Sequence, residues 1–521
     1  MNNNPSIFND VIGPVMRGPS SSHTAASWRI ARTCLEILNE PLKKAIVDFD
    51  KNGIWAFNYR EQGTVMGING GLLGLEITDS LMKDTEKVAT EGEISITYEI
   101  NSFPTKHINT VRLLLEGING KTVQVVAASL GGGSFEIQQI DGFDVSICGD
   151  YFELLVQSKT KDGLPDDLKM IFHENLLLSQ SSGKNGNLIN LKSPNKITDD
   201  IIKHFNDDSI FGKVIIVNPI LPIISGNATE MPFTTIGSLL EYAREENLDL
   251  GELGIIYEKC QSGLPDSVLL SKMEEIVNII ENSIQNGLAG TKYEDRILHQ
   301  QSHLINKAEK AGKILQNSLV NKIIAYVSAI MESKSAMEVI VALPTAGSCG
   351  TVGGVLKAVA DDMNSTPQEK IKAYFAAGIA GAYFAKGPGF SAEEHGCQVE
   401  CGASAGMAAA GLAQLFGGTA KQALSAASMA VQNMIGLVCD PIADRVEAPC
   451  LGKNISAAVN ALSSATMACS GFDAVIPFDE VLETVSRVSK QMPTCVKCTG
   501  QGGLAMTPTA LRLKTKLINF R

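Results

Sequence analysis

Residues 396–415 read Gly-Cys-Gln-Val-Glu-Cys-Gly-Ala-Ser-Ala-Gly-Met-Ala-Ala-Ala-Gly-Leu-Ala-Gln-Leu, and glycine, alanine and serine dominate this run. The same small residues are enriched over a longer region, roughly 341–475. Small side chains allow helices to approach closely but leave little side-chain volume to fill a core. Tightly packed helices of this kind suit a buried cofactor.

The apolar residues around this region follow a helical spacing. From about residue 236 they recur in steps of three and four, as in the pair Leu239 and Ala243. The chain from 228 to 521 is therefore predicted to form a large all-helical domain.

The first 150 residues mix helical and strand patterns. A Gly/Pro/Ser loop precedes a helix-like stretch at 25–38, and strand-like runs follow at 44–49, 93–100 and 121–129. Residues 1–150 are predicted to form an α+β domain, which makes the whole chain multidomain.

Between these regions, residues 151–222 contain six short elements in the order βαββαβ. The predicted strands are 152–157, 175–180, 188–191 and 213–217, and the predicted helices are 164–173 and 197–205. This order is that of a small ferredoxin-like fold, a common frame for regulatory domains that sense amino acids. The fold alone does not establish sensing.

The net charge of the chain restricts its partners. Its 521 residues carry a formal net charge of −12, and the pI is near 5.2. Such a protein repels phosphate backbones and anionic lipids, so we expect no nucleic-acid or membrane partner and a small-molecule substrate instead. The first residues show no basic segment followed by an apolar run, which predicts a cytoplasmic protein.

Cysteine is the residue type that points to chemistry, with eleven copies in the chain. Four segments of the helical half stand out: 344–350, 396–402, 439–441 and 448–450. Three of them place a cysteine beside glycine or proline, where turned backbone presents thiolates and amides to one cavity, as an iron–sulfur cluster requires. By spacing alone, the cysteines match neither ferredoxin runs nor paired zinc motifs, so packing cysteines and a zinc site stay open.

These segments resemble the α-chain motifs of iron–sulfur-dependent L-serine dehydratases. The resemblance rests on Pro344-Thr-Ala-Gly-Ser-Cys-Gly350, on the 396–410 run quoted above, and on Cys439-Asp-Pro441 followed by Pro449-Cys450. In that family three cysteines hold the cluster at separations of about 42 and 11 residues. Cys397, Cys439 and Cys450 have separations of 42 and 11. The resemblance thus implies that these three residues hold a [4Fe–4S] cluster.

The resemblance extends over most of the chain. Gly18-Pro-Ser-Ser-Ser-His-Thr24 is similar to the β-domain signature of the family, 107–110 and 130–133 match later motifs, and 502–509 resembles its closing motif. Single-chain fusions with the β part before the α part, and ACT-like modules of βαββαβ order, both occur in the family. Membership implies a lyase that deaminates L-serine to pyruvate and ammonia, with a cluster iron as Lewis acid, no pyridoxal phosphate and a homodimeric assembly.

The family match also directs attention to the loop before the first helix. The hydroxyls of Ser20, Ser21, Ser22 and Thr24, with the free amides of a helix N-terminus, are predicted to bind the substrate carboxylate. His23 is the first candidate for proton transfer, because imidazole titrates near working pH. Lys497 is a further candidate for carboxylate binding, and His395 lies two residues before Cys397.

The chain departs from the family pattern at two places. Where the family carries Gly-His-Gly-Thr-Asp, this sequence has Glu61-Gln-Gly-Thr-Val65, so Gln62 and Val65 replace a histidine and an acid. An Arg-Glu pair before the closing glycines is replaced by Lys497 and Cys498. These changes leave open another β-substituted amino acid, such as threonine or cysteine, or a regulatory paralogue that binds an amino acid without turnover.

Four further cysteines lie close in sequence to these segments, namely Cys349, Cys401, Cys495 and Cys498. Each is either a packing residue or a thiol that caps the fourth iron.

Overall fold

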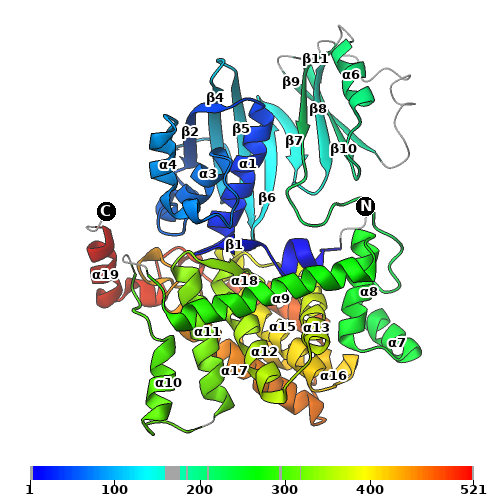
Figure 1. Cartoon of the computed structure of the whole chain (residues 1–521), viewed down its shortest axis with the longest axis vertical. Coiled ribbons are helices and arrows are strands. Elements are labelled where there is room, and N and C mark those ends of the chain that lie inside the picture. Colours follow the sequence, from blue (N-terminus) through cyan, green and yellow to red (C-terminus); the bar gives the residue numbers. More distant parts are fainter. Residues whose placement is uncertain are drawn as a thin grey trace. The chain divides into compact units, whose positions relative to one another are not determined.

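The computed structural model describes residues 4–158, 176–183, 186–207, 211–292, 296–316 and 318–518. The chain divides into two compact units, one formed by residues 23–227 and the other by 1–22 together with 228–521. An N-terminal α+β region and a large helical region are both present, as the sequence predicted (Figure 1).

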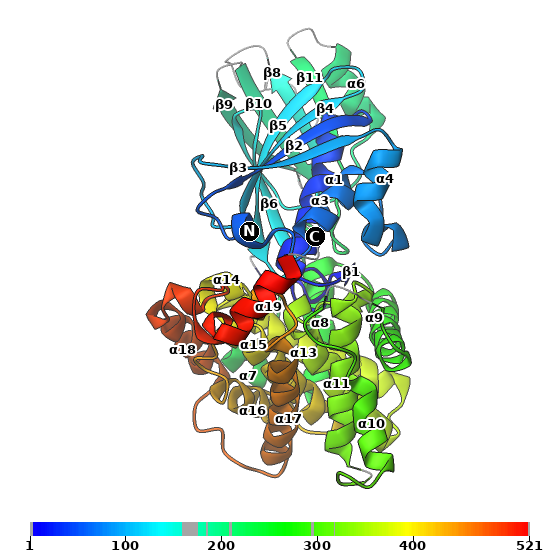
Figure 2. The same cartoon turned by 90° about the vertical axis from the view of Figure 1, so that its left-hand side faces the viewer.

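The first part of the 23–227 unit is a six-stranded sheet with helices on one face. Strand order is β3-β2-β4-β5-β6-β7, and only the β2–β3 pair is parallel. Helix α1 contacts β4, β5 and β6 and packs against α3 (Figure 2). The element bounds are β2 Leu42–Asp50, β3 Ser95–Asn101, β4 Thr110–Gly117, β5 Thr122–Gly131, β6 Ser134–Ile140, β7 Phe143–Ile147, α1 Ala26–Leu38, α2 Trp55–Asn58, α3 Thr64–Leu72 and α4 Thr85–Glu91.

Alternation explains why β4 and its neighbours form this sheet. Val111, Leu113 and Leu115 of β4 are fully buried, whereas Leu114 between them is exposed. Side chains of a strand point alternately to opposite faces, so one face of β4 supplies the core under α1. The strands predicted from sequence at 44–49, 93–100 and 121–129 correspond to β2, β3 and β5, with ends shifted by a few residues.

The second part of this unit is an antiparallel four-stranded sheet in the order β11-β8-β10-β9. Its buried side chains, among them Leu154, Val156 and Phe205, form a separate core beneath α6. The predicted helix at 164–173 lies outside the described residues. The element bounds are β8 Phe152–Ser158, β9 Leu177–Gly183, β10 Gly186–Ser193, α6 Asp199–Asp207 and β11 Phe211–Val217.

The helical unit packs its helices very closely. A Cβ added to Gly411 of α15 would lie 2.9 Å from the carbonyl oxygen of Ala373 in α13. Gly354 of α12 approaches Val327 of α11 in the same way, at 2.8 Å from the backbone nitrogen. The close approach predicted from the small residues is therefore present, because a larger residue at either glycine would collide with backbone.

The unit contains thirteen α-helices within the described residues, and α9 runs across its face in Figure 1. Their bounds are α7 Ile236–Glu246, α8 Leu250–Ser262, α9 Asp266–Ala289, α10 Ser302–Lys310, α11 Leu319–Ser335, α12 Cys349–Met363, α13 Pro367–Lys386, α14 Ala392–His395, α15 Cys401–Leu415, α16 Ala420–Gln432, α17 Cys450–Cys469, α18 Phe478–Gln491 and α19 Pro508–Ile518. None of the helices in the described ranges is both long enough and apolar enough to cross a membrane.

The N-terminal residues complete the helical unit. Strand β1 (Val15–Arg17) pairs antiparallel with β12 (Val339–Val341), the only strand of the otherwise helical 228–521 region in the part that the structure describes. Ahead of β1, the buried carboxylate of Glu258 accepts hydrogen bonds from Ser6 Oγ and from the amide of Ile7, both at 2.6 Å. Residues far apart in sequence are thereby joined.

Glu258 predicts a pH dependence of stability. Burial raises the pKa of its carboxyl from 4.5 to about 8. Between about pH 4.5 and 8 the folded protein therefore keeps a proton that the unfolded chain releases. The free energy of unfolding is highest below about pH 4.5 and falls as the pH rises to about 8. Glu258→Gln should remove this loss, and its advantage over wild type should grow between pH 5 and 8 to on the order of 3 kcal/mol.

Thermal unfolding of both proteins across this pH range measures the difference. Glu245→Gln, at an exposed position of α7, is the matched control and should track wild type. A Glu258→Gln protein whose difference from wild type does not change with pH would contradict the assignment.

Candidate metal centre

Cys397 lies in a tight turn between two helices. Helix α14 ends at His395, Gly396 adopts φ +76°, and a short 3₁₀ turn, Cys397–Val399, leads into α15. A Cβ at Gly396 would lie 2.8 Å from Met492 and 3.1 Å from the carbonyl oxygen of Leu437. Both the positive φ and this close contact require glycine. The turn buries the Cys397 thiol.

Cys439 is held by the backbone of a distant segment. Its amide donates to the carbonyl of Val496 at 2.8 Å, and its carbonyl accepts the amide of Cys498 at 3.0 Å. Cys439 and Lys497 thus form a parallel β-bridge. The C-terminal segment therefore holds the backbone of Cys439 in place.

A cluster of thiols results, which we call the thiol cluster: Cys397, Cys401, Cys439 and Cys498. The thiols of Cys401 and Cys439 hydrogen-bond to Cys397, and Cys498 hydrogen-bonds to Cys439. All four residues are buried. One ligand atom each from Cys397, Cys439 and Glu400 lie within 4.8 Å of one another, close enough to hold a metal ion.

Cys450 lies near this cluster but outside that three-residue group. Cys450 is the first residue of α17, and it is buried. Burial, and next the charge of the Cys397 thiolate, raises the pKa of its thiol to about 12. A four-iron cluster is larger than a single ion, so its ligands need not surround one point. The assignment of Cys397, Cys439 and Cys450 as the ligand set remains a prediction.

The electrostatics of the thiol cluster favour a thiolate at Cys397. Its pKa lies well below the ordinary value, first because Cys401 and Cys439 donate hydrogen bonds to it and also because Lys453 is nearby. Burial and the Cys397 charge raise the pKa of Glu400 to about 8. Glu400 also accepts a hydrogen bond from Thr345 Oγ1 at 2.8 Å. A deprotonated sulfur is the form that binds metal.

Asp440 connects this site to two further elements. Its Oδ1 accepts from Lys453 Nζ of α17 at 2.7 Å, and its Oδ2 accepts from the amide of Leu504 at 2.9 Å. Both charged side chains are largely buried, with exposures of 5% and 14%. Asp440 therefore ties the residue after Cys439 to the helix that begins with Cys450.

Asp440→Ala should destabilise the protein by about 3 kcal/mol, because it leaves a buried ammonium group without its carboxylate. Chemical denaturation of the metal-free protein measures this loss. The control is Asp266→Ala, which breaks the half-exposed ion pair with Lys259 at 2.9 Å and should cost no more than about 1 kcal/mol. Equal losses of unfolding free energy in the two variants would show that the buried Asp440–Lys453 pair stabilises the protein no more than the half-exposed pair does.

The serine loop approaches the same segments within the helical unit. Ser21 Oγ accepts from the amide of Ala346 at 3.2 Å, and Ser22 Oγ donates to Glu393 Oε1 at 2.9 Å. Ala346 lies beside Thr345, the partner of Glu400. Ser20 is also buried, with its hydroxyl 3.3 Å from that of Ser22. The hydroxyls predicted to bind substrate thus already have protein partners.

His23 and Thr24 belong to the 23–227 unit. His23 is fully buried, its Nε2 lies 2.9 Å from Asn58 Oδ1, and its ring lies 5.9 Å from that of Trp55. Thr24 Oγ1 donates to the carbonyl oxygen of Gln62 at 3.2 Å. The Gln62 side chain is buried, and its Nε2 has no hydrogen-bond partner among the described residues. Val65, the other residue of this segment that departs from the family pattern, is a buried apolar side chain.

The other candidate residues from the sequence differ in how deeply they are buried. Lys497 is half-buried beside Cys439 through the β-bridge, and His395 is half-buried with a pKa lowered by burial. Cys349 is buried at the start of α12, and Cys495 is exposed. Glu400 was not predicted as a site residue, although the Gly-Cys-Gln-x-Glu motif contained it.

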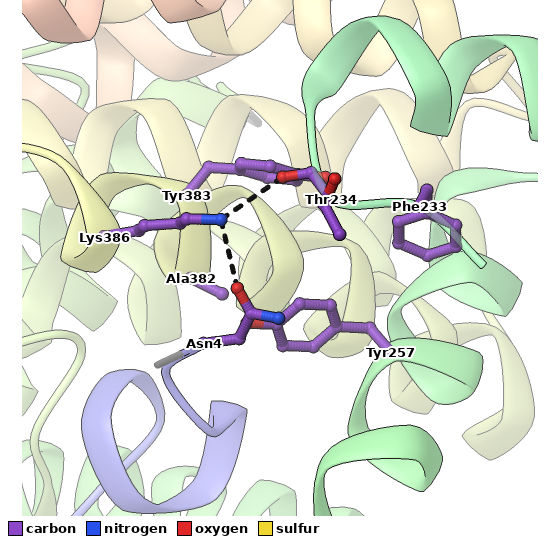
Figure 3. Close-up of a pocket in the computed structure, with 7 residues that line it drawn as sticks. All are labelled: Asn4, Phe233, Thr234, Tyr257, Ala382, Tyr383 and Lys386. Atoms are coloured by element: carbon purple, nitrogen blue, oxygen red, sulfur yellow. Dashed lines mark hydrogen bonds between the residues drawn. The ribbon is translucent and has the colours of Figure 1, made fainter. Parts of the chain in front are cut away.

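One pocket of the helical unit lies elsewhere and is shown in Figure 3. Lys386 Nζ donates there to Asn4 Oδ1 at 3.1 Å and to the carbonyl of Thr234 at 3.3 Å. The lining residues include no cysteine or carboxylate. This pocket offers no metal ligands, and we place the candidate centre at the thiol cluster.

Comparison with known proteins shows the family to which the chain belongs. The model of the family described as serine dehydratase alpha chain matches residues 174–505. The chain belongs to this serine dehydratase family. The match includes Cys397, Cys439, Cys450 and Cys498, and it confirms the resemblance inferred from the motifs.

Individual members of the serine dehydratase family match long parts of the chain. A probable L-serine dehydratase alpha chain of Bacillus subtilis is 34% identical over 55% of this chain and 95% of its own length. The L-serine dehydratase alpha chain of Peptoniphilus asaccharolyticus is 30% identical over 54% and 96%. L-serine dehydratase 1 of Escherichia coli is 27% identical over 76% of this chain and 87% of its own.

The residues of this serine dehydratase family member suit an iron–sulfur cluster. Such a cluster needs thiolates in surroundings that exclude water and supply hydrogen-bond donors. Cys397, Cys439 and Cys450 are all buried, and the thiolate form is favoured at Cys397. The donor set is therefore compatible with the cofactor that the family resemblance implies.

Proposed function

We propose that this protein is an iron–sulfur-dependent L-serine dehydratase, a lyase that converts L-serine to pyruvate and ammonia. The observation that carries the proposal is the family match over a region in which Cys397 and Cys439 lie close enough to share a metal. The alpha chain of a named L-serine dehydratase is matched over 96% of its length.

In this proposal Cys397, Cys439 and Cys450 hold a [4Fe–4S] cluster. When bound, a cluster with three thiolate ligands supplies a Lewis-acidic iron that makes a hydroxyl a better leaving group. Hydrogen bonds from neighbouring thiols reach the Cys397 sulfur, and backbone hydrogen bonds with Val496 and Cys498 hold Cys439 in place. The chemistry requires no pyridoxal phosphate.

The protein residues would bind the amino acid and move its α-proton. Ser20, Ser21, Ser22 and Thr24 with Lys497 are the proposed carboxylate ligands, and the serines would exchange some of their present partners for the substrate. His23, oriented by Asn58, is the proposed base for the α-proton. Loss of that proton and of the β-hydroxyl gives an enamine, and its imine tautomer is hydrolysed to pyruvate and ammonia.

We further propose that the chain contains three domains: an α+β domain at 1–150, an ACT-like module at 151–222 and a catalytic helical domain at 228–521. Support for the module comes from the strand order β11-β8-β10-β9, which is fourth-first-third-second within the module, as in ferredoxin-like folds. By family resemblance the protein is proposed to act as a cytoplasmic homodimer, which sedimentation of the purified protein tests.

Anaerobic purification tests the function directly. We expect a brown protein with about four irons and matching acid-labile sulfide per chain that forms pyruvate from L-serine. Assays with L-threonine and L-cysteine belong in the same experiment, because Gln62 and Val65 differ from the family pattern. A cluster without serine turnover would overturn serine as substrate, and a colourless protein containing zinc would overturn the whole proposal.

A further inference from the structure

Lys334 places a positive charge inside the helical unit. Its side chain is fully buried, although it lies in the last turn of α11, one position before the helix ends at Ser335. Lysine is almost never fully buried unless it is paired, because an ammonium group leaves water only at a large cost in free energy. A specific anion is therefore expected beside this ammonium group.

The protein itself supplies little to this ammonium group. Among the described residues, its single hydrogen-bond partner is the backbone carbonyl oxygen of Val446, and no carboxylate lies within ion-pair distance of it. An ammonium group has three N–H donors, so two remain for a ligand. The negative end of α11 favours a cation at this position, but an exposed lysine would serve that purpose equally well.

Lys334 lies beside both parts of the proposed active site. A Cβ added to Gly18, at the start of the loop that carries the three serines, would collide with the carbonyl oxygen of Lys334. Its partner Val446 precedes the proposed cluster ligand Cys450 by four residues. Burial, and next the Cys397 charge, raises the pKa of the Cys450 thiol, and the Lys334 charge opposes that rise. The ammonium group is thus close enough to act on this thiol.

We propose that Lys334 binds the carboxylate of the amino-acid substrate. The inference rests on the proposed function, because it presupposes an amino acid bound between the serine hydroxyls and the cluster. An ammonium group held away from water attracts a carboxylate more strongly than an exposed one does. The substrate would supply the anion that the buried charge lacks among the described residues, and the serine hydroxyls would complete the hydrogen bonds to its carboxylate.

Two other lysines near the thiol cluster suit this role less well. Lys453 already pairs with Asp440 at 2.7 Å, so its charge is compensated within the protein. Lys497 is half-buried and keeps contact with water, which weakens its attraction for a carboxylate. Lys334 combines full burial with the lack of an ion-pair partner among the described residues.

Lys334→Met tests the proposal in the anaerobically loaded protein, because methionine is of similar length and carries no charge. Loss of a charged hydrogen-bond partner should raise KM for L-serine about 10- to 100-fold and leave kcat within about threefold of wild type. L-Alanine lacks the leaving hydroxyl and is expected to compete with L-serine. Its inhibition should weaken by the same factor, whereas inhibition by L-alaninamide, which has no carboxylate, should stay unchanged. An unchanged KM, or equal weakening of both inhibitors, would overturn the proposal.

The stability of the ligand-free protein separates carboxylate binding from a structural role. Lys334→Met removes a buried charge, so its unfolding temperature should lie about 2–4 °C above that of wild type. A lysine that the fold requires would give a lower temperature instead, and that result would also overturn the proposal. Lys334→Gln keeps a hydrogen-bond donor without the charge, and it should weaken L-alanine inhibition as Lys334→Met does.

The matched control is Lys322→Met on the same helix, where the lysine forms a partly exposed ion pair with Asp362 at 3.5 Å. It should match wild type in KM and in both inhibition constants. Loss of iron and sulfide from Lys334→Met would assign Lys334 to the cluster and overturn its role as a carboxylate ligand. If the wild-type protein forms no pyruvate, calorimetric titration with L-alanine replaces the inhibition assay, so failure of the proposed function is seen separately from failure of this inference.

Discussion

Cys439→Ala should abolish pyruvate formation and remove most of the iron and sulfide from the anaerobically reconstituted protein. Cys439 is a proposed cluster ligand, and its thiol contacts both Cys397 and Cys498. Removing it deletes a proposed ligand and the hydrogen bonds that its thiol makes with Cys397 and Cys498. Iron and sulfide analysis, visible absorbance and a pyruvate assay on one preparation measure all three losses.

The matched control is Cys260→Ala, which removes a half-buried thiol of α8 away from the thiol cluster. It should keep the colour and the activity of wild type. Circular dichroism and the unfolding temperature of Cys439→Ala establish that the chain still folds. Full iron content in a folded Cys439→Ala protein would exclude this cysteine as a ligand.

His23→Ala should lower kcat on L-serine by about 10²- to 10⁴-fold, the range usual for removing a general base. Its imidazole is fully buried and lies 2.9 Å from Asn58 Oδ1, which fixes the ring. Because His23 lies in the other compact unit from the cysteines, the cluster content should remain that of wild type. Steady-state kinetics with iron analysis separate these two effects.

The division of the effect between kcat and KM identifies the role of His23. A base lowers kcat, whereas a residue that only binds the carboxylate raises KM. His23→Gln keeps a hydrogen bond to Asn58 but cannot accept the α-proton, so it should be as slow as His23→Ala. The control is His299→Ala at an exposed position. A kcat unchanged in both His23 variants would exclude general-base catalysis by this residue.

Periodic patterns in the sequence predicted elements more reliably than the partners of each element. The strands β8, β9, β10 and β11 and the helix α6 were expected from local patterns and are present with small shifts in their ends. Strand β12 was not expected, because three residues, Val339–Val341, carry too little pattern of their own. They form a strand only because β1, more than 300 residues earlier, pairs with them.

The candidate site divides in the same way. The spacing of Cys397, Cys439 and Cys450 was visible in the sequence because motifs preserve the residues that carry chemistry. Glu400 was not assigned a role, and Cys498 was left open between packing and capping an iron, because a carboxylate acquires a raised pKa, and a thiol acquires sulfur neighbours, only from distant segments of the folded chain. The partners of Ser21 and Ser22 were equally hidden, because they come from residues 346 and 393.

Three properties of this protein could be predicted from its sequence alone: the small-residue composition of its helices, the family that its motifs resemble and the cysteines available as ligands. These properties depend on neighbouring residues or on fixed spacings along the chain, so they can be recognised without the folded structure. Two further features became visible only in the folded chain: the backbone of Val496 and Cys498 holds Cys439, and an N-terminal strand completes the helical unit. Those contacts join residues tens to hundreds of positions apart, and they form only when burial of the core brings distant segments together.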